Sequence, residues 1–139
     1  MAMNPFRLRI LTLEESFYEG DVDSLIAPGA DGYFGVLAHH APMLAALRPG
    51  KLLVRERDSI ENVYAVSGGF LEVSDNSVTL LADAIESAAD IDLTRAEQAK
   101  QRALERISSR RGDVDIARAE AALTRALNRV AVYHSWTSG

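Results

Sequence analysis

The sequence predicts an α+β protein, in which an N-terminal β-sandwich or flattened barrel of about ten short strands precedes a C-terminal antiparallel two-helix hairpin. Up to about residue 87, short apolar runs are separated by Gly, Pro, Asn and Asp. From about residue 91 to 132, such breakers are almost absent, and Ala, Arg, Glu and Leu dominate. We therefore expect one domain over residues 1–87 and a second over residues 88–139.

The predicted strands of the first domain are apolar or alternating runs bounded by turn residues. They span residues 6–13, 22–27, 33–37, 43–47, 51–56, 62–67, 70–73 and 78–82. Pro28-Gly29 and Pro49-Gly50 are expected to end strands, and Gly68-Gly69 to form a bulge or sharp bend where a side chain would clash. The predicted core consists of Phe6, Leu8, Ile10, Val22, Leu25, Val36, Leu44, Leu47, Leu53, Val63, Ala65, Phe70, Leu71, Val73, Val78 and Leu80.

The second domain has clear helix start signals. Asp92 is a suitable N-cap for a helix over residues 93–108, and Asp113 or Asp115 for a second helix that runs to about Val132. The facing stripes are Ala96, Ala99, Ala103 and Ile107 in the first helix, and Ile116, Ala119, Leu123, Ala126, Leu127 and Val130 in the second. Because alanine side chains bury little surface, we expect stable helices whose pairing is marginal.

Composition limits the classes of function. The 139-residue chain carries a formal net charge of -5, which argues against general nucleic-acid binding. It has no cysteine, which excludes a disulfide framework, a thiolate metal site and a cysteine nucleophile. No apolar run approaches the roughly 20 residues of a membrane span, and residues 1–9 lack the features of a secretory signal. We expect a cytoplasmic protein that associates with a membrane only through a partner.

The sequence carries little that predicts catalysis. His39 and His40 are adjacent and cannot both face one point on a strand, and no nearby carboxylate spacing suggests a metal. Ser67 does not stand in a nucleophile-elbow pattern, and no phosphate-binding P-loop is present. We therefore expect a protein without enzymatic activity of its own, in which the histidines are structural or interfacial.

The arginines of the hairpin are more informative. Arg95 and Arg102 share one face of the first helix, and Arg125 and Arg129 share one face of the second, at matched levels of an antiparallel pair. Guanidinium groups bind phosphate well, and neighbouring acidic residues could hold sugar hydroxyls or an amine. From spacing alone, however, a solvated charged face is the better interpretation.

The chain as a whole resembles the epsilon subunit of bacterial and chloroplast F-type ATP synthases. The resemblance rests on residues 31–37, 40–42, 47–50, 67–73, 78–82 and 91–96, in this order and spacing. It implies a non-catalytic subunit of the rotating central stalk, whose sandwich binds the gamma subunit and rests on the ring of c subunits. Asp31, Gly32 and Tyr33 would then lie near the ring and His40 near gamma. The Pro-Gly that usually precedes His-Ala-Pro in the family is replaced here by Ala38-His39.

The resemblance also implies a mobile hairpin that either folds against the sandwich or extends toward the catalytic head and inhibits ATP hydrolysis. The residues expected to face an acidic segment of the beta subunit are Arg106, Arg110, Arg111 and Arg118.

Some members of the family bind ATP in the folded hairpin through an Ile-Asp-x-x-Arg-Ala motif, which this chain has at residues 91–96. The matching positions are Glu86, Asp92, Arg95, Arg102, Arg125 and Arg129, so that ATP is expected as a regulatory ligand and no cofactor is required. The implied location is the cytoplasmic face of the bacterial plasma membrane rather than the chloroplast thylakoid. The alternative is an adaptor or nucleotide sensor of the same architecture that has no connection with ATP synthase.

Overall fold

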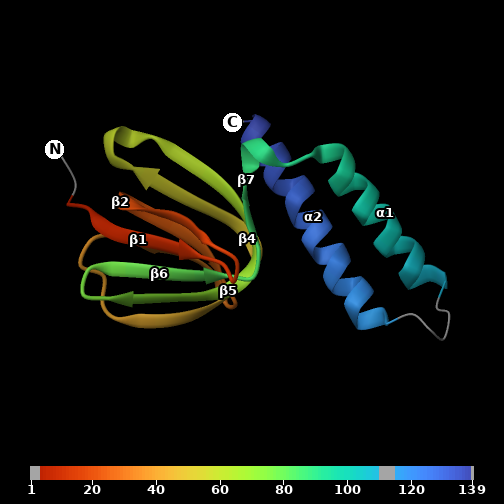
Figure 1. Ribbon diagram of the computed structural model, residues 1–139, viewed down its shortest axis with the longest axis horizontal. Helices are drawn as coiled ribbons and strands as arrows, with labels where there is room; N and C mark the ends of the chain where they lie inside the picture. The colour runs from red at the N-terminus through yellow and green to blue at the C-terminus, as the bar shows by residue number, and fades with distance from the viewer. Residues whose placement is uncertain (1–3, 110–114, 139) are drawn as a thin grey trace. The chain divides into compact units, whose positions relative to one another are not determined.

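The computed structural model describes residues 4–109 and 115–138, apart from the side chain of Ser59 (Figure 1). The chain divides into two compact units, Met1–Ser87 and Ala88–Gly139. The first unit contains β-strands and the second contains helices.

The first unit is a seven-stranded sheet in the described residues, and this sheet closes on itself (Figure 1). Its hydrogen-bonded order is β1-β6-β5-β4-β2-β3, and β1 also pairs with β2, while β7 pairs with β5. The β1–β6 pair is parallel and the other pairs are antiparallel. The strands are β1 (Phe6–Leu11), β2 (Ser16–Gly29), β3 (Gly32–Val36), β4 (Met43–Glu56), β5 (Glu61–Ser74), β6 (Ser77–Ala82) and β7 (Ile85–Ser87).

The strands are fewer and longer than the sequence predicts, because three of them continue through residues that were expected to end or interrupt them. Strands β2, β4 and β5 are each 14 residues long. Strand β2 ends at Pro28-Gly29 as predicted, although it begins at Ser16, before its predicted start. Pro49-Gly50 lies within β4, where Pro49 still pairs with Ser67 of β5. The prediction that Pro49-Gly50 ends a strand is therefore wrong, because β4 bends there without leaving the sheet.

The bend at Gly68-Gly69 confirms the predicted clash. Gly69 has φ +137°, and an added Cβ would collide with the backbone oxygen of Leu81 on β6. Up to this point β5 pairs with β7, and beyond it β5 pairs with β6. Because β4 bends alongside it, the long strands turn a corner between the two layers of the sandwich.

The core is mostly as predicted, but the corner changes which residues face inward. In β4 the buried positions are Leu47 before the bend and Leu52 and Val54 after it, so the alternation shifts by one residue at Pro49-Gly50. The predictions for Leu53 and Val63 are therefore wrong, since both are only half-buried. Leu44 and Phe70 were also placed in the core and are instead 72% and 55% exposed. A phase shift of one residue exchanges the two faces of a strand.

The second unit consists of a 3₁₀ turn (Ala88–Asp90) and the helices α1 (Leu93–Ser109) and α2 (Ile116–Ser138). The Asp92 carboxylate accepts a hydrogen bond from the Arg95 amide at 3.1 Å, and Asp115 accepts one from the Arg118 amide at 3.1 Å. These bonds confirm Asp92 and Asp115 as N-caps. The alternative cap, Asp113, lies outside the described residues.

Helix α2 extends beyond its predicted end at Val132. Hydroxyl groups in its last turns bond to backbone carbonyls, as between Ser138 Oγ and His134 O at 2.7 Å. Ser and Thr hydroxyls in helices commonly bond in this way to the carbonyl three or four residues before them. Among the described residues, no helix has the length and apolar character needed to cross a bilayer.

Candidate functional site

The seam between α1 and α2 is built from alanine. Ala96 and Ala103 are the buried residues of α1, and Ala119 and Ala126 are buried in α2. The helices pack against each other, and in an antiparallel pair residues at one level have a constant sum of residue numbers. Ala96 with Ala126 and Ala103 with Ala119 share the same sum. These four alanines therefore define the register of the hairpin.

Every arginine in the described part of the two helices stands at one of two positions relative to these alanines. Four arginines directly precede a seam alanine, and two follow one by three residues. With about 3.6 residues per turn, both positions lie on the same flank of the seam. Because the helices are antiparallel, the flanks of α1 and α2 face the same side. This arginine flank consists of Arg95, Arg102, Arg106, Arg118, Arg125 and Arg129.

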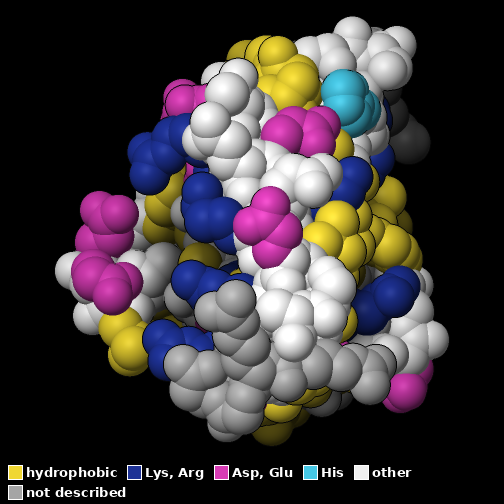
Figure 2. Space-filling view, turned by 90° about the vertical axis from the view of Figure 1, so that its right-hand side faces the viewer, with side chains coloured by type: hydrophobic (Ala, Val, Ile, Leu, Met, Phe, Trp, Pro, Cys, Tyr) yellow, Lys and Arg dark blue, Asp and Glu magenta, His cyan; other side chains and the backbone are white. Residues whose placement is uncertain are grey.

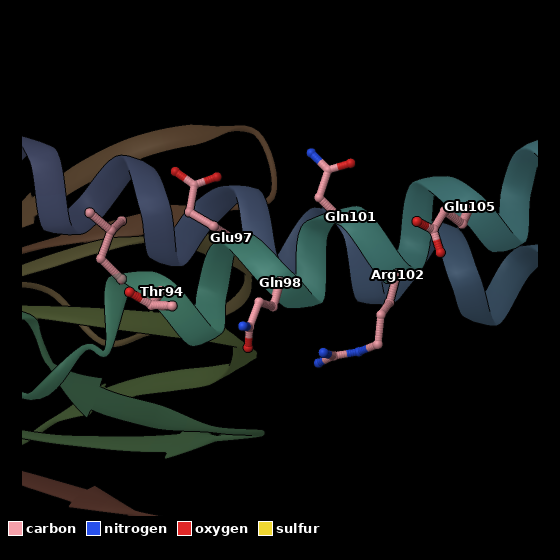
Figure 3. Close-up of a pocket in the computed structure, with 7 residues that line it drawn as sticks. Thr94, Glu97, Gln98, Gln101, Arg102 and Glu105 are labelled. Carbon is pink, nitrogen blue, oxygen red and sulfur yellow. The ribbon is translucent and has the colours of Figure 1, made fainter.

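The arginine flank is open to solvent, and its acidic members Asp92 and Asp115, four residues before seam alanines, are the N-caps of the two helices. Five of its arginines are exposed, and Arg129 is half-buried. Glu97 and Glu120 directly follow seam alanines and so belong to the opposite flank. In the close-up, Arg102 points to one side of α1, whereas Glu97 points to the other (Figure 3). The space-filling view shows several basic side chains on this side of the molecule, with acidic side chains among them (Figure 2).

The sequence separated these arginines into two sets, one for ATP and one for the beta subunit. The register of the seam places the described members of both sets on one flank. The predicted stripes contained these four alanines among other residues, and the spacing of the arginines to the seam became clear only once the structure showed which stripe residues are buried. Arg110 and Arg111 lie outside the described residues.

The two acidic residues predicted to bind ATP, Asp92 and Glu86, lie in different units of the chain. The carboxylate of Asp92 is engaged at the start of α1, where it accepts the Arg95 amide. Glu86 belongs to the other unit, on β7 opposite Ala65 of β5, and is half-buried. Asp92 thus has a local structural role.

A shallow hollow of about 520 Å³ runs along α1 (Figure 3). Of the six predicted ATP ligands, only Arg102 lines it, together with Leu93, Thr94, Glu97, Gln98, Gln101 and Glu105. Two carboxylates oppose the binding of a phosphate group. The hollow is therefore a poor match for a nucleotide, and the arginine flank remains the better candidate.

The β2–β3 hairpin holds the residues predicted to lie near the c-ring. Its turn is Ala30-Asp31, with Asp31 exposed at the tip and Gly32 at φ +136°. Tyr33 is 51% exposed, yet it is fixed at both ends. Its hydroxyl accepts the Lys51 amide at 3.0 Å, and the Arg48 guanidinium lies 5.7 Å from its ring centroid. This hairpin presents the exposed Asp31 carboxylate at its tip, next to a tyrosine that contacts β4 through its hydroxyl group and its ring.

The loop between β3 and β4 carries His40, the residue predicted to lie near gamma. His40 is half-buried, and its Nδ1 lies 2.7 Å from the carbonyl oxygen of Ala41. Because a carbonyl only accepts, this contact assigns the proton of a neutral ring to Nδ1. The Nε2 atom is then an acceptor for a donor outside the loop.

The outer face of the sheet carries a row of apolar side chains that the sequence did not predict. Ala46 of β4 lies opposite Phe70 of β5, Phe70 lies opposite Leu81 of β6, and Leu81 lies opposite Leu11 of β1. Phe70 and Leu81 are 55% and 52% exposed. Directly paired residues share one face, so that these four side chains form a continuous apolar row. Leu44, two residues before Ala46, extends it with a side chain that is 72% exposed.

Both units match family models. Residues 5–88 match the beta-sandwich domain of the ATP synthase delta/epsilon chain, and residues 89–133 match its long alpha-helix domain. The fold and the order of the two units thus define a two-domain delta/epsilon chain of ATP synthase.

Relatives agree with this class. The chain is 49% identical over 104 residues to an ATP synthase epsilon chain of Protochlamydia amoebophila, covering 75% of this chain and 71% of the relative. It is 45% identical to that of Desulforamulus reducens, covering 75% and 78%. A chain in the Euglena gracilis mitochondrial ATP synthase (OSCP/F1/c-ring) has a TM-score of 0.83 at 25% identity, with coverage of 94% and 82%. The chain belongs to the ATP synthase epsilon chain family, whose members are non-catalytic subunits of the complex.

Proposed function

We propose that this chain is a rotor subunit of the central stalk, whose sandwich binds the gamma subunit and the c-ring and whose hairpin regulates ATP hydrolysis. The observation that carries the proposal is the apolar row Leu11–Leu81–Phe70–Ala46 on the outer face of the sheet. Removing a large apolar side chain from water contributes about 1.5–3 kcal/mol, so the row favours a permanent partner. Family membership makes gamma the partner that we propose for this face.

In this proposal, the sandwich has two contact regions. The apolar row and the His40 loop bind gamma, since Leu44 follows that loop closely in β4. The tip formed by Asp31, Gly32 and Tyr33 rests on the c-ring. A tip that is fixed by β4 can transmit torque without bending, which supports this role.

Binding of the purified gamma subunit tests the first contact region. We expect a stable complex with the wild-type chain, and a dissociation constant at least about tenfold higher for Phe70→Asn combined with Leu81→Asn. Ile60→Asn is the matched control, because Ile60 is also 56% exposed but lies beside η1 (Arg57–Ser59), outside the row. Equal binding by all three proteins would refute the proposed use of the row.

The hairpin is proposed as the regulatory element. Its alanine seam buries little surface, so the paired state is only marginally stable and a ligand can shift it. Its arginine flank gathers positive charge, which an anionic ligand would stabilise. We propose that four arginines face an acidic segment of the beta subunit when the hairpin extends. They are Arg106 and Arg118, together with Arg110 and Arg111, which lie outside the described residues.

ATP is the proposed ligand of the folded hairpin, held by Arg95, Arg102, Arg125 and Arg129. Asp92 and Glu86 complete the proposed set, with Asp92 acting also as the cap of α1. ATP and an acidic protein segment would then use the same flank, so ATP should favour the folded, non-inhibitory state. Through the complex, the chain would lie at the cytoplasmic face of the bacterial plasma membrane.

Reconstitution with the catalytic head tests regulation. Removing residues 91–139 should raise the ATP hydrolysis rate, and Arg106→Gln with Arg118→Gln should raise it in the full-length chain. Lys100→Gln is the control, because Lys100 precedes the seam residue Ala103 by three residues and so stands on the flank opposite the arginines. An unchanged rate after truncation would remove the regulatory part of the proposal while leaving the rotor role in place.

A further inference from the structure

The loop that carries His40 contains a turn that its own residues do not favour. His40 N donates to Leu37 O at 3.3 Å, which closes a four-residue turn with Ala38 and His39 at its centre. His39 has φ 63°, in the left-handed region. A positive φ at the third residue of a turn favours Gly or Asn, whereas a residue with a larger side chain adopts it at a free-energy cost.

One side chain from a distant part of the sequence holds this turn. The Oδ1 atom of Asn76 accepts the His39 amide at 2.7 Å, and Asn76 Nδ2 donates to Pro5 O at 3.1 Å. The backbone oxygen of Asn76 also accepts the Arg7 amide at 3.2 Å. One asparagine thus connects the N-terminal segment, the β5–β6 turn and the β3–β4 loop.

The β5–β6 turn gives Asn76 a fixed position. Ser74 pairs with Ser77, which leaves Asp75 and Asn76 as a two-residue connection with φ 52° and 58°. Two positive φ values are typical of the tight hairpin turn whose twist matches that of the strands. Because the turn is part of the sheet, the Asn76 amide is presented to the loop in one orientation.

We propose that Asn76 is the positioning residue of the gamma-binding loop: its side-chain amide holds His39 in the left-handed conformation and thereby presents His40 to the partner. This inference rests on the proposed function, since it assumes that the loop contacts gamma. When the hydrogen bond from His39 is lost, the turn should open, and only a fraction of molecules should remain competent to bind. The hydrogen bond from the Arg7 amide of β1 to the Asn76 backbone oxygen does not depend on the side chain of Asn76.

The first test is amide hydrogen exchange in the isolated full-length chain. Asn76→Gly keeps access to positive φ but removes the side-chain amide group. It should accelerate hydrogen exchange at the His39 backbone amide by about fivefold to tenfold, the effect of losing one hydrogen bond. Asn76→Asp retains the Oδ1 acceptor but loses the Nδ2 donor to Pro5 O, so it should protect the His39 amide less than wild type and more than Asn76→Gly. Asp75→Gly, in the same turn, is the control and should leave His39 protection unchanged.

The second test is the rate of association with the purified gamma subunit. Asn76→Gly should slow association by about the same factor, because fewer molecules present the loop. His39→Gly added to Asn76→Gly should restore the rate, since Gly adopts the turn without support. A general loss of stability would not be rescued by this second substitution, so the rescue distinguishes positioning from an effect on folding.

The outcomes separate the two proposals. Unchanged His39 exchange in Asn76→Gly, or accelerated exchange with unchanged association, would overturn the role of Asn76 while wild-type binding still supports the proposed function. Failure of the wild-type chain to bind gamma would overturn the proposed function, and with it the presentation of His40 to gamma, whatever the exchange data show.

Discussion

Phe70 on β5 lies directly opposite Leu81 on β6 on the outer face of the sheet, and both side chains are more than half exposed. The next pair along the same strands, Leu71 opposite Leu80, is fully buried. Two neighbouring apolar pairs therefore have opposite surroundings. The inner pair stabilises the sandwich, and the outer pair is available to a partner.

Substitutions at Phe70 and Leu71 should separate these two roles. Leu71→Ala should lower the free energy of unfolding by about 2–5 kcal/mol, because it leaves a cavity in the core. Phe70→Ala should change it by less than about 1 kcal/mol, since its ring is largely in water. Denaturant unfolding of the purified chain measures both values. A loss at Phe70 equal to that at Leu71 would mean that the ring contributes to the core.

Gly69→Ala should be among the most damaging single-methyl changes in the sandwich. The added Cβ would meet the backbone oxygen of Leu81, and φ is +137°, so we expect a loss of about 2–4 kcal/mol. Gly35→Ala is the matched control, because the nearest atom to its added Cβ is Leu25 O at 3.8 Å. Thermal unfolding of the two variants should show a clear difference, and similar melting temperatures would contradict the tight crossing at Gly69.

The arginine flank should bind ATP in the isolated chain. Calorimetric titration with ATP, with and without Mg²⁺, should give saturable binding, and Arg102→Gln with Arg125→Gln should weaken it by about tenfold or more. ADP tests the need for the third phosphate, and Lys100→Gln, on the opposite flank, should bind like wild type. If the arginine variant and wild type bind ATP equally, the ATP site lies elsewhere. The arginine flank would then serve only to bind acidic protein segments.

The stability of the sandwich should fall at high pH. Burial, with a hydrogen bond to Glu56, raises the pKa of Tyr18 to about 12, and burial also raises the pKa of Tyr64. Tyrosine in an unfolded chain titrates near 10, so between about pH 10 and 12 the unfolded state loses protons that the folded state retains. The contribution is present below pH 10 and is lost as pH rises through the folded-state pKa.

Tyr18→Phe should reduce this pH dependence. Its free energy of unfolding should fall less steeply above pH 10, by on the order of 1 kcal/mol in total relative to wild type. Denaturant unfolding at several pH values between about 8 and 12 measures the slope. Parallel slopes in the two proteins would show that other groups dominate alkaline unfolding.

Local features of the fold were predictable because they depend on residues near each other in sequence. Asp92 and Asp115 cap the helices through bonds that span three residues. Alternation located most of the core of β1 and β6, which are short and do not cross a corner. Strand β4 was divided wrongly at Pro49-Gly50, because a Pro-Gly pair that ends a strand, as Pro28-Gly29 ends β2, has the same sequence signature as one at which a strand bends.

The candidate sites show the same division between local and long-range information. Helical spacing alone identified Arg95, Arg102, Arg125 and Arg129. That Arg106 and Arg118 lie on the same flank became clear only from the register of the alanine seam. The outer apolar row required the shift in alternation that the corners impose, so Phe70 was mistaken for a core residue. No local pattern could connect Asn76 to His39, since they are 37 residues apart.

The sequence by itself determined that a β domain precedes an alanine-seamed helical hairpin, and it carried the motifs of the family. Tertiary structure decided which apolar side chains face water, which arginines share a flank and what holds the His39 turn. The physical reason is that caps, helix periodicity and turn preferences arise from contacts within a few residues. Pairing between segments that are distant in sequence decides where a strand continues, which of its side chains face inward and what holds a loop in place. No single stretch of sequence identifies the partner segment.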